Sequence, residues 1–237
     1  MQKTVIIVAG GKGLRMGGEL PKQFIPLLGK PVLMHTTDVF FQWDSTVNLI
    51  IVIPEEHSAY WNMLCEELNF TIPHRVVFGG ETRFHSVLNS ISTPHLCESA
   101  KQSGFALTTN GLIAVHDGVR PLVSPNVITS CFNTAETYSA AIPVIPVIES
   151  IREINGDVSH PFDRSRLRVV QTPQVFRADI LKDAYKQPYN ERFTDDASVV
   201  EAAGHNIHLV NGNFENIKIT TPLDLQYAEL SIKNRYN

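Results

Sequence analysis

The alternation of apolar and polar segments along this chain predicts an α/β protein. Short apolar, β-branched runs typical of buried strands alternate with stretches of helical periodicity over most of the 237 residues, which indicates βαβ units. One interval, from about 147 to 171, breaks the alternation with prolines nearby and a hairpin signal. We therefore expect a Rossmann-like, mostly parallel twisted sheet flanked by helices, with a β-arm inserted there. The length suits a single domain over residues 1–237.

The elements of the first half follow from local patterns. The β-branched run Thr4–Val8 ends in glycines and is expected to be a buried strand. Pro54, followed by two acidic residues, is typical of a helix start, and Ser124-Pro125 is typical of a helix cap with proline at the first helical position. The other expected elements are a helix at 31–41, strands at 49–53, 75–78 and 112–115, and a helix that buries Val87, Leu88 and Ile91.

The second half contains the arm and then returns to the sheet. Asn155-Gly156 is a strong hairpin-turn signal within the arm. A helix is expected from Thr194, as its N-cap residue, through Ala203, with Gly204 ending it. The remaining expected elements are strands at 208–210 and 216–219 and a C-terminal helix that opens at Thr221-Pro222.

Composition excludes several functional classes. The formal net charge of −4 gives no global positive field that would attract nucleic acid. An apolar content of 43% and a charged content of 19% fit a soluble globular protein, and no apolar run has the length of a membrane span or a signal-peptide core. Cys65, Cys97 and Cys131 are far apart and form no C-x-x-C pair, which indicates reduced thiols. We expect a cytoplasmic protein that binds neither nucleic acid nor membrane.

The glycine-rich loop after the first strand has the features of a phosphate-binding loop. Glycines allow the backbone to approach an anion closely, so that successive N–H groups converge on it. Arg15 and Lys22 add a planar cationic fork and a flexible point charge. The loop matches neither G-x-x-x-x-G-K-[ST] nor G-x-G-x-x-G. Lys12, also in this loop, could equally be a solvated surface lysine.

Three other polar segments also follow expected strands. They are the Gly79–Arg83 turn, the His116–Pro121 turn and the segment around Lys218. In an open parallel sheet, ligands bind outside the carboxyl ends of the strands, so these segments and the first loop are expected to form one site. The alternative for Asp117 and Arg120 is an ion pair that braces a turn.

Several blocks of the sequence together resemble a known family. The block AGGKGLRMGGELPKQF resembles the signature loop of nucleotidylyltransferases, and its PKQF end is similar to the cytidylyltransferases that act on sugar-alcohol phosphates. The other matching blocks are GGETRFHSV, HDGVRP, DRSRLRVVQTPQ, TDDASVVE and NIKITTPLDL. Because the blocks run from the first strand to the C-terminal helix, the resemblance implies that residues 1–237 are one nucleotidylyltransferase domain.

The resemblance also implies an activity. The expected reaction transfers the cytidylyl group of CTP to 2-C-methyl-D-erythritol 4-phosphate, giving 4-diphosphocytidyl-2-C-methyl-D-erythritol and pyrophosphate in non-mevalonate isoprenoid biosynthesis. D-ribitol 5-phosphate is the alternative acceptor, although the TDDAS and PVIESI segments favour methylerythritol phosphate. A catalytically silent nucleotide-binding regulator is the alternative of another class, but it need not retain Lys22, Arg164 and Lys218 together. The incomplete dinucleotide fingerprint disfavours an oxidoreductase.

Roles for individual residues are carried over from the family's matching blocks. The residues expected to act in catalysis are Arg15, Lys22, Arg164 and Lys218. The residues expected to bind CTP are Ala9, Gly10, Gly11, Gly13, Arg15, Lys22, Gly80, Glu81, Arg83, Ser86, Asp117 and Lys218. The residues expected to bind the acceptor are Arg120, Ser150, Arg164 and Thr194. The resemblance further implies a Mg²⁺ ion on the CTP phosphates, near Asp117.

The sequence departs from the family at two of these positions and leaves a third open. The family often has aspartate where Glu81 stands and threonine where Ser150 stands. Arg166 and Arg168 lie close enough to Arg164 that either could contact the acceptor instead.

The arm is expected to form a homodimer. Two adjacent strands are marginally stable alone in water, so the arm needs a surface to pack against. In the resembling family, the arms of two subunits interlock, which would bring Arg164 into the acceptor site of the partner.

Overall fold

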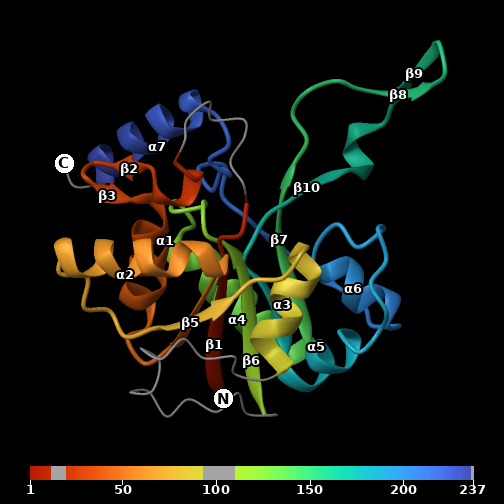
Figure 1. Cartoon of the computed structure of the whole chain (residues 1–237). Coiled ribbons are helices and arrows are strands. Elements are labelled where there is room, and N and C mark those ends of the chain that lie inside the picture. The colour runs from red at the N-terminus through yellow and green to blue at the C-terminus, as the bar shows by residue number, and fades with distance from the viewer. Residues whose placement is uncertain (12–19, 93–109, 236–237) are drawn as a thin grey trace.

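The computed structural model describes residues 1–11, 20–92 and 110–235. Its centre is an eight-stranded mixed sheet flanked by helices on both faces, so the α/β prediction is confirmed (Figure 1). The strands of this sheet are β1 (Gln2–Val8), β4 (Asn48–Ile53), β5 (Arg75–Phe78), β6 (Gly111–Asp117), β7 (Ala140–Pro146), β10 (Arg168–Val170), β11 (Gln174–Arg177) and β12 (His208–Asn211).

One part of the sheet is parallel, in the order β6-β1-β4-β5. β11 runs antiparallel between β6 and β7, while β7 also pairs with β10 antiparallel and with β12 parallel. The register places Val8, the last residue of β1, beside Asp117, the last residue of β6. The glycine-rich loop therefore begins next to the Asp117 turn, as expected for a site at the carboxyl ends of parallel strands.

Alternation of side chains along the strands buries both faces of the sheet. In β1, Val5 and Ile7 contribute to one core cluster and Ile6 to the other. The helices are α1 (Val32–Trp43), α2 (Ser58–Glu67), α3 (Arg83–Ser92), α4 (Pro125–Tyr138), α5 (Ala178–Ala184), α6 (Asp196–Ala202) and α7 (Pro222–Arg235). The first cluster includes residues of α1, α2 and α4, and the second includes residues of α3, α5 and α6. A third, smaller cluster lies under α7.

Two small hairpins lie outside the central sheet. β2 (Pro26–Leu27) pairs with β3 (Lys30–Pro31), and β8 (Ile151–Asn155) pairs with β9 (Val158–Phe162). The β8–β9 hairpin projects away from the rest of the molecule at the upper right of Figure 1. Its tip follows Asn155, where Gly156 takes a positive φ of 61° that glycine adopts easily. The projecting part is therefore shorter than the expected arm of 147–171, because β10 at its end pairs with β7 in the central sheet.

One expected helix start and one expected strand are wrong. The N-cap of α6 is Asp195, whose carboxylate accepts from the Ser198 N–H, so Thr194 lies one residue before the cap. The segment 216–219 is not a strand: the Ile219 N–H donates to the Val119 carbonyl of a turn instead of to a strand. Pro54 is followed by the short 3₁₀ helix η3 (Glu55–His57), and the α-helix begins at Ser58. The other short helices are η2 (Lys22–Phe24) and η5 (Arg164–Arg166).

Candidate active site

Two adjoining pockets open at the carboxyl ends of the parallel strands. The first lies between the glycine loop after β1, the turn before α3 and the end of β6. Its lining residues in the described parts of the chain are Val8, Ala9, Gly10, Gly11, Lys22, Gln23, Gly80, Glu81, Thr82, Arg83, Ser86, Asp117, Val119 and Lys218. Backbone from several turns and a few cations thus surround this pocket, an arrangement suited to a phosphorylated ligand.

Close packing of the backbone shapes the first pocket. A Cβ on Gly80 would lie 2.5 Å from the Cβ of His85, and a Cβ on Gly118 would lie 2.9 Å from the Cβ of Ala9. The Gly80 turn is also held by Ser86, whose hydroxyl oxygen accepts from the Gly80 N–H at 3.1 Å and donates to the Thr82 carbonyl at 2.9 Å. These glycines are therefore required by close approach of the chain to itself.

The second pocket adjoins the first at the Asp117 side chain. It is lined by Arg83, Asp117, Arg120, Val170, Gln171, Thr172, Gln174, Thr194, Asp195 and Lys218. Arg83, Asp117 and Lys218 line both pockets. A ligand in one pocket would therefore lie against the same charges as a ligand in the other.

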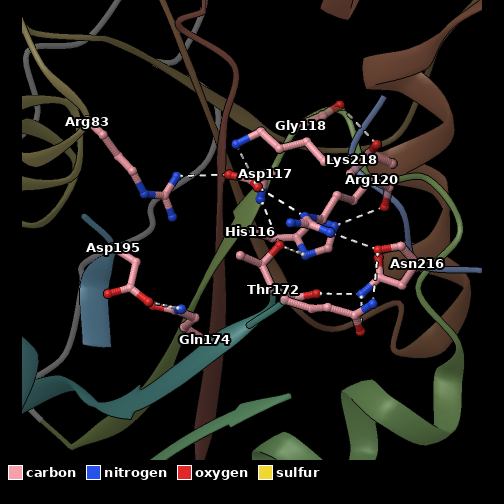
Figure 2. Close-up of polar contacts among 12 residues, drawn as sticks. Arg83, His116, Asp117, Gly118, Arg120, Thr172, Gln174, Asp195, Asn216 and Lys218 are labelled. Carbon is pink, nitrogen blue, oxygen red and sulfur yellow. Dashed lines mark hydrogen bonds and ion pairs between the residues drawn. The ribbon is translucent and has the colours of Figure 1, made fainter. Parts of the chain in front are cut away.

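The side chains that line both pockets belong to a cluster of charges around Asp117 (Figure 2). The Asp117 carboxylate pairs with Arg83 at 3.0 Å, with Arg120 at 3.0 Å and with Lys218 at 3.1 Å. Burial by itself raises the pKa of Asp117, but the three neighbouring cations hold it well below its ordinary value. The carboxylate is therefore charged, and the cluster keeps an excess of positive charge that favours anionic ligands.

Arg83 connects this cluster to α6. Its Nη2 pairs with the carboxylate of Asp196, a fully buried residue that also accepts a 2.7 Å hydrogen bond from the Tyr185 hydroxyl. Burial alone lowers the pKa of Arg83, but the carboxylates of Asp196 and Asp117 raise it above its ordinary value. Asp196 was not predicted as a site residue. The second aspartate of TDDASVVE, directly after the helix cap, was the sequence feature that could have indicated it.

Beneath Asp117, a set of buried polar groups joins separate segments of the chain. His116 contacts Thr172 and the Arg120 backbone, and Asn216 contacts Thr172 and Arg120 (Figure 2). Burial lowers the pKa of His116 to about 3, so the ring is neutral near pH 7. Thr172 and Asn216 were not predicted, because their neighbours are distant in sequence.

The structure brings most of the expected CTP-binding residues to the first pocket. Those that line it are Ala9, Gly10, Gly11, Lys22, Gly80, Glu81, Arg83, Ser86, Asp117 and Lys218. Gly13 and Arg15 lie outside the described residues.

The expected acceptor-binding residues divide into two groups. Arg120 and Thr194 line the second pocket. Ser150 is exposed at the base of the β8–β9 hairpin, and Arg164 is exposed on η5, where its guanidinium donates to the Ile148 carbonyl. Neither Ser150 nor Arg164 is among the described residues that line these two pockets.

Comparison with known proteins settles the family. The model of the family 2-C-methyl-D-erythritol 4-phosphate cytidylyltransferase (IspD) matches residues 3–234. The chain belongs to this family. It is therefore an enzyme of the nucleotidyltransferase type, as the sequence resemblance implied.

Relatives and solved structures agree over nearly the whole length. Proteins named 2-C-methyl-D-erythritol 4-phosphate cytidylyltransferase from Phocaeicola vulgatus and Bacteroides fragilis are 50% and 52% identical, covering 98% and 96% of this chain and 100% and 98% of the relatives. The crystal structure of the Francisella tularensis protein of the same name superposes with a TM-score of 0.76 at 28% identity, covering 97% of this chain and 99% of that one.

The described residues contain neither a membrane-spanning helix nor a metal-ligand cluster. In residues 1–11, 20–92 and 110–235, no helix is long and apolar enough to cross a membrane. In the same ranges, no three His, Cys, Asp or Glu side chains are grouped to hold a metal ion.

Proposed function

We propose that this enzyme transfers the cytidylyl group of CTP to 2-C-methyl-D-erythritol 4-phosphate, releasing pyrophosphate. The observation that carries the proposal is the pair of pockets that share Arg83, Asp117 and Lys218, in a chain that belongs to the family of that name. The first pocket, with its glycine turns, receives CTP, and the second receives the polyol phosphate. The shared cations then lie where the two ligands meet.

The chemistry needs positioning more than acid–base catalysis. A phosphate oxygen of the acceptor attacks the α-phosphorus of CTP in line, the new P–O bond forms, and the bond to pyrophosphate breaks. The nucleophile is already anionic, so no strong general base is required. Lys22 and Lys218 bind the phosphates and stabilise the charge of the transition state, and Arg15 is assigned the same role from the family resemblance.

Mg²⁺ fits this site as a cofactor. Mg²⁺ is commonly held by one or two carboxylates together with substrate phosphates, and Asp117 offers one carboxylate beside the first pocket, where the ion would take the place of Lys218 on that carboxylate. When bound, the ion neutralises phosphate charge. Asp117 would hold it, while Arg83 and Arg120 keep that carboxylate in place. Loss of activity in a chelator, restored by Mg²⁺, tests this assignment.

A pyrophosphate-release assay tests the reaction. With CTP, turnover should be much faster with 2-C-methyl-D-erythritol 4-phosphate than with D-ribitol 5-phosphate, and slower with ATP, GTP or UTP in place of CTP. The ribitol alternative loses support because the family match is to the methylerythritol enzyme. Equal turnover with a purine triphosphate would overturn the cytidylyl assignment, and faster turnover with the ribitol substrate would overturn the acceptor assignment.

We also propose a homodimer formed through the arm. The β8–β9 hairpin leaves Ile154 and Val158 largely exposed, at 76% and 57%, so it lacks the packing that an isolated hairpin needs. In the dimer, Arg164 would reach the partner's second pocket, as the family resemblance implies. Arg166 on η5 and Arg168 at the start of β10 are also exposed and remain candidates for that contact.

Subunit mixing tests the shared site. Lys22→Ala and Arg164→Ala homodimers should each be nearly inactive. In a heterodimer of the two, one site carries both defects and the other carries neither, so activity should return after exchange. Verified heterodimers without recovered activity would mean that Arg164 does not act across the interface.

A cytoplasmic location is the remaining proposal. It is supported by Cys65 and Cys131, which are both free thiols. Cys97 lies outside the described residues. Cell fractionation with an activity assay tests the location.

A further inference from the structure

His116 lies directly below the turn that carries two of the charged site residues. It precedes Asp117 on β6, and its side chain is fully buried. Its Nε2 is 3.0 Å from the Arg120 carbonyl oxygen, and its Nδ1 is 2.9 Å from the Thr172 hydroxyl. A carbonyl can only accept, so Nε2 carries the proton, and in a neutral ring Nδ1 is then the acceptor for the Thr172 O–H.

Thr172 completes the support of this turn. Its hydroxyl oxygen accepts a 3.1 Å hydrogen bond from the Asp117 N–H. The turn itself is closed by the Arg120 N–H, which donates to the Asp117 carbonyl at 3.1 Å. The His116 ring and the Thr172 hydroxyl therefore hold the turn at both ends, at the amide of Asp117 and at the carbonyl of Arg120.

Asn216 ties the same groups to a third segment. Its side-chain Nδ2 donates to the Thr172 backbone carbonyl at 2.8 Å, and its backbone carbonyl accepts from Arg120 Nη1 at 2.8 Å. Lys218 follows two residues later. The segments that supply Asp117, Arg120 and Lys218 are thus joined below the second pocket.

We propose that His116 and Thr172 are positioning residues that hold the Asp117–Arg120 turn in the geometry needed for the polyol phosphate. This inference rests on the proposed function, because it takes the second pocket as the acceptor site. Among the described residues, Arg120 and Thr172 line the second pocket and do not line the first. Loss of the pair should therefore weaken use of the acceptor more than use of CTP.

The direct test removes the Thr172 hydroxyl at nearly constant volume. Thr172→Val should raise the KM for 2-C-methyl-D-erythritol 4-phosphate about tenfold, equivalent to about 1.4 kcal/mol, and should raise the KM for CTP by a smaller factor. Thr172→Ser keeps the hydroxyl and should recover most of the loss. A purely structural role would instead lower stability without separating the two KM values.

A second variant tests the partner of the hydroxyl. His116→Gln can still donate to the Arg120 carbonyl but loses the Nδ1 acceptor. We expect the same acceptor-selective rise in KM, and no further rise when His116→Gln is combined with Thr172→Val, because both changes remove one interaction. This variant also provides the test if Thr172→Val does not fold.

The outcomes separate failure of this inference from failure of the proposed function. Equal rises in both KM values, or wild-type values in Thr172→Val and His116→Gln, would overturn the positioning role. If the wild-type enzyme released no pyrophosphate from CTP and the acceptor, the proposed function would fail. In that case ¹⁵N NMR of the His116 ring still reports on the network: the Nε2–H tautomer is expected, and an Nδ1–H tautomer would overturn the inference.

Discussion

The two pockets meet at the same charged side chains but are built differently. Around the first, the backbone of glycine-containing turns comes close to the cavity. The second is bordered by polar side chains that are already bonded to other protein groups. Gln174, for example, donates to Asp195 at 2.8 Å and accepts from the Ala197 N–H at 2.9 Å. The first pocket therefore depends on close backbone packing that glycine allows. The second depends on hydrogen bonds between its lining side chains and other protein groups.

The largest effect should come from the lysines. Among the described residues, Lys218 lines both pockets, whereas Lys22 lines the first and not the second. Lys22→Ala and Lys218→Ala should each lower kcat by about 10²–10³-fold, because a preorganised charge is lost from the transition state. Steady-state kinetics should show a higher KM for both substrates in Lys218→Ala, but only for CTP in Lys22→Ala.

Lys233→Ala is the matched control, because Lys233 is an exposed α7 residue paired only on the surface with Glu229. It should behave as wild type. Near wild-type turnover of Lys218→Ala at saturating substrates would mean that the charges shared by the two pockets do not act in catalysis.

The next largest effect should come from the buried ion pair between Asp196 and Arg83, a residue that lines both pockets. Asp196→Asn leaves Arg83 without one of its buried partners and should lower the free energy of unfolding by about 3 kcal/mol, as measured by urea denaturation. Asp183→Asn breaks an exposed ion pair with Lys186 and should cost less than about 1 kcal/mol. Similar losses in the two variants would mean that the buried ion pair contributes no more stability than an exposed one.

Acid should weaken the support below the second pocket. The folded pKa of His116 is about 3 against an ordinary 6.5, so between these values the unfolded chain binds a proton that the folded chain does not. Stability from this residue is therefore present above pH 6.5 and is lost as pH falls towards 3.

From pH 7 to pH 5 the loss should be about 2 kcal/mol, and His116→Gln should show a pH dependence that is shallower by that amount in urea denaturation. Parallel pH profiles for wild type and variant would contradict the neutral buried ring. His35 and His74, whose pKa values burial also lowers, are unchanged in both proteins and so do not affect the difference.

The smallest expected effect isolates the first pocket. A Cβ at Gly80 would lie 2.5 Å from the Cβ of His85, so Gly80→Ala must shift the turn. The KM for CTP should rise about tenfold. The KM for the polyol phosphate serves as the internal control and should stay unchanged. A rise in the acceptor KM instead would exchange the assignments of the two pockets.

The same contrast explains how much could be predicted from sequence. The parallel strands and the glycine turns of the first pocket are local patterns, and the residues expected there do line it where the structure describes them. The pairs behind the second pocket are distant: Arg83 and Asp196 are 113 residues apart, and His116 and Thr172 are 56 apart. No local pattern reports such pairs.

The errors in the predicted elements have similar causes. The segment 216–219 has the alternation of a strand, but its polar groups bond to loops instead of to a neighbouring strand. Thr194 and Asp195 are both good cap residues, and the capping box with Ser198 selects Asp195. The pattern correctly predicted a helix after Thr194 and wrongly predicted a strand at 216–219, because tertiary contacts decide where a helix begins and whether an extended segment pairs with a strand.

The sharing of Lys218 by both pockets has a thermodynamic consequence. Its Nζ rests on the Asp117 carboxylate, but the side chain is 43% exposed and can turn towards an arriving anion. If the first ligand draws Lys218 away, the second meets a different charge balance, so the two affinities are coupled. Reciprocity then requires CTP to change the affinity for the polyol phosphate by the same factor as the polyol phosphate changes that for CTP.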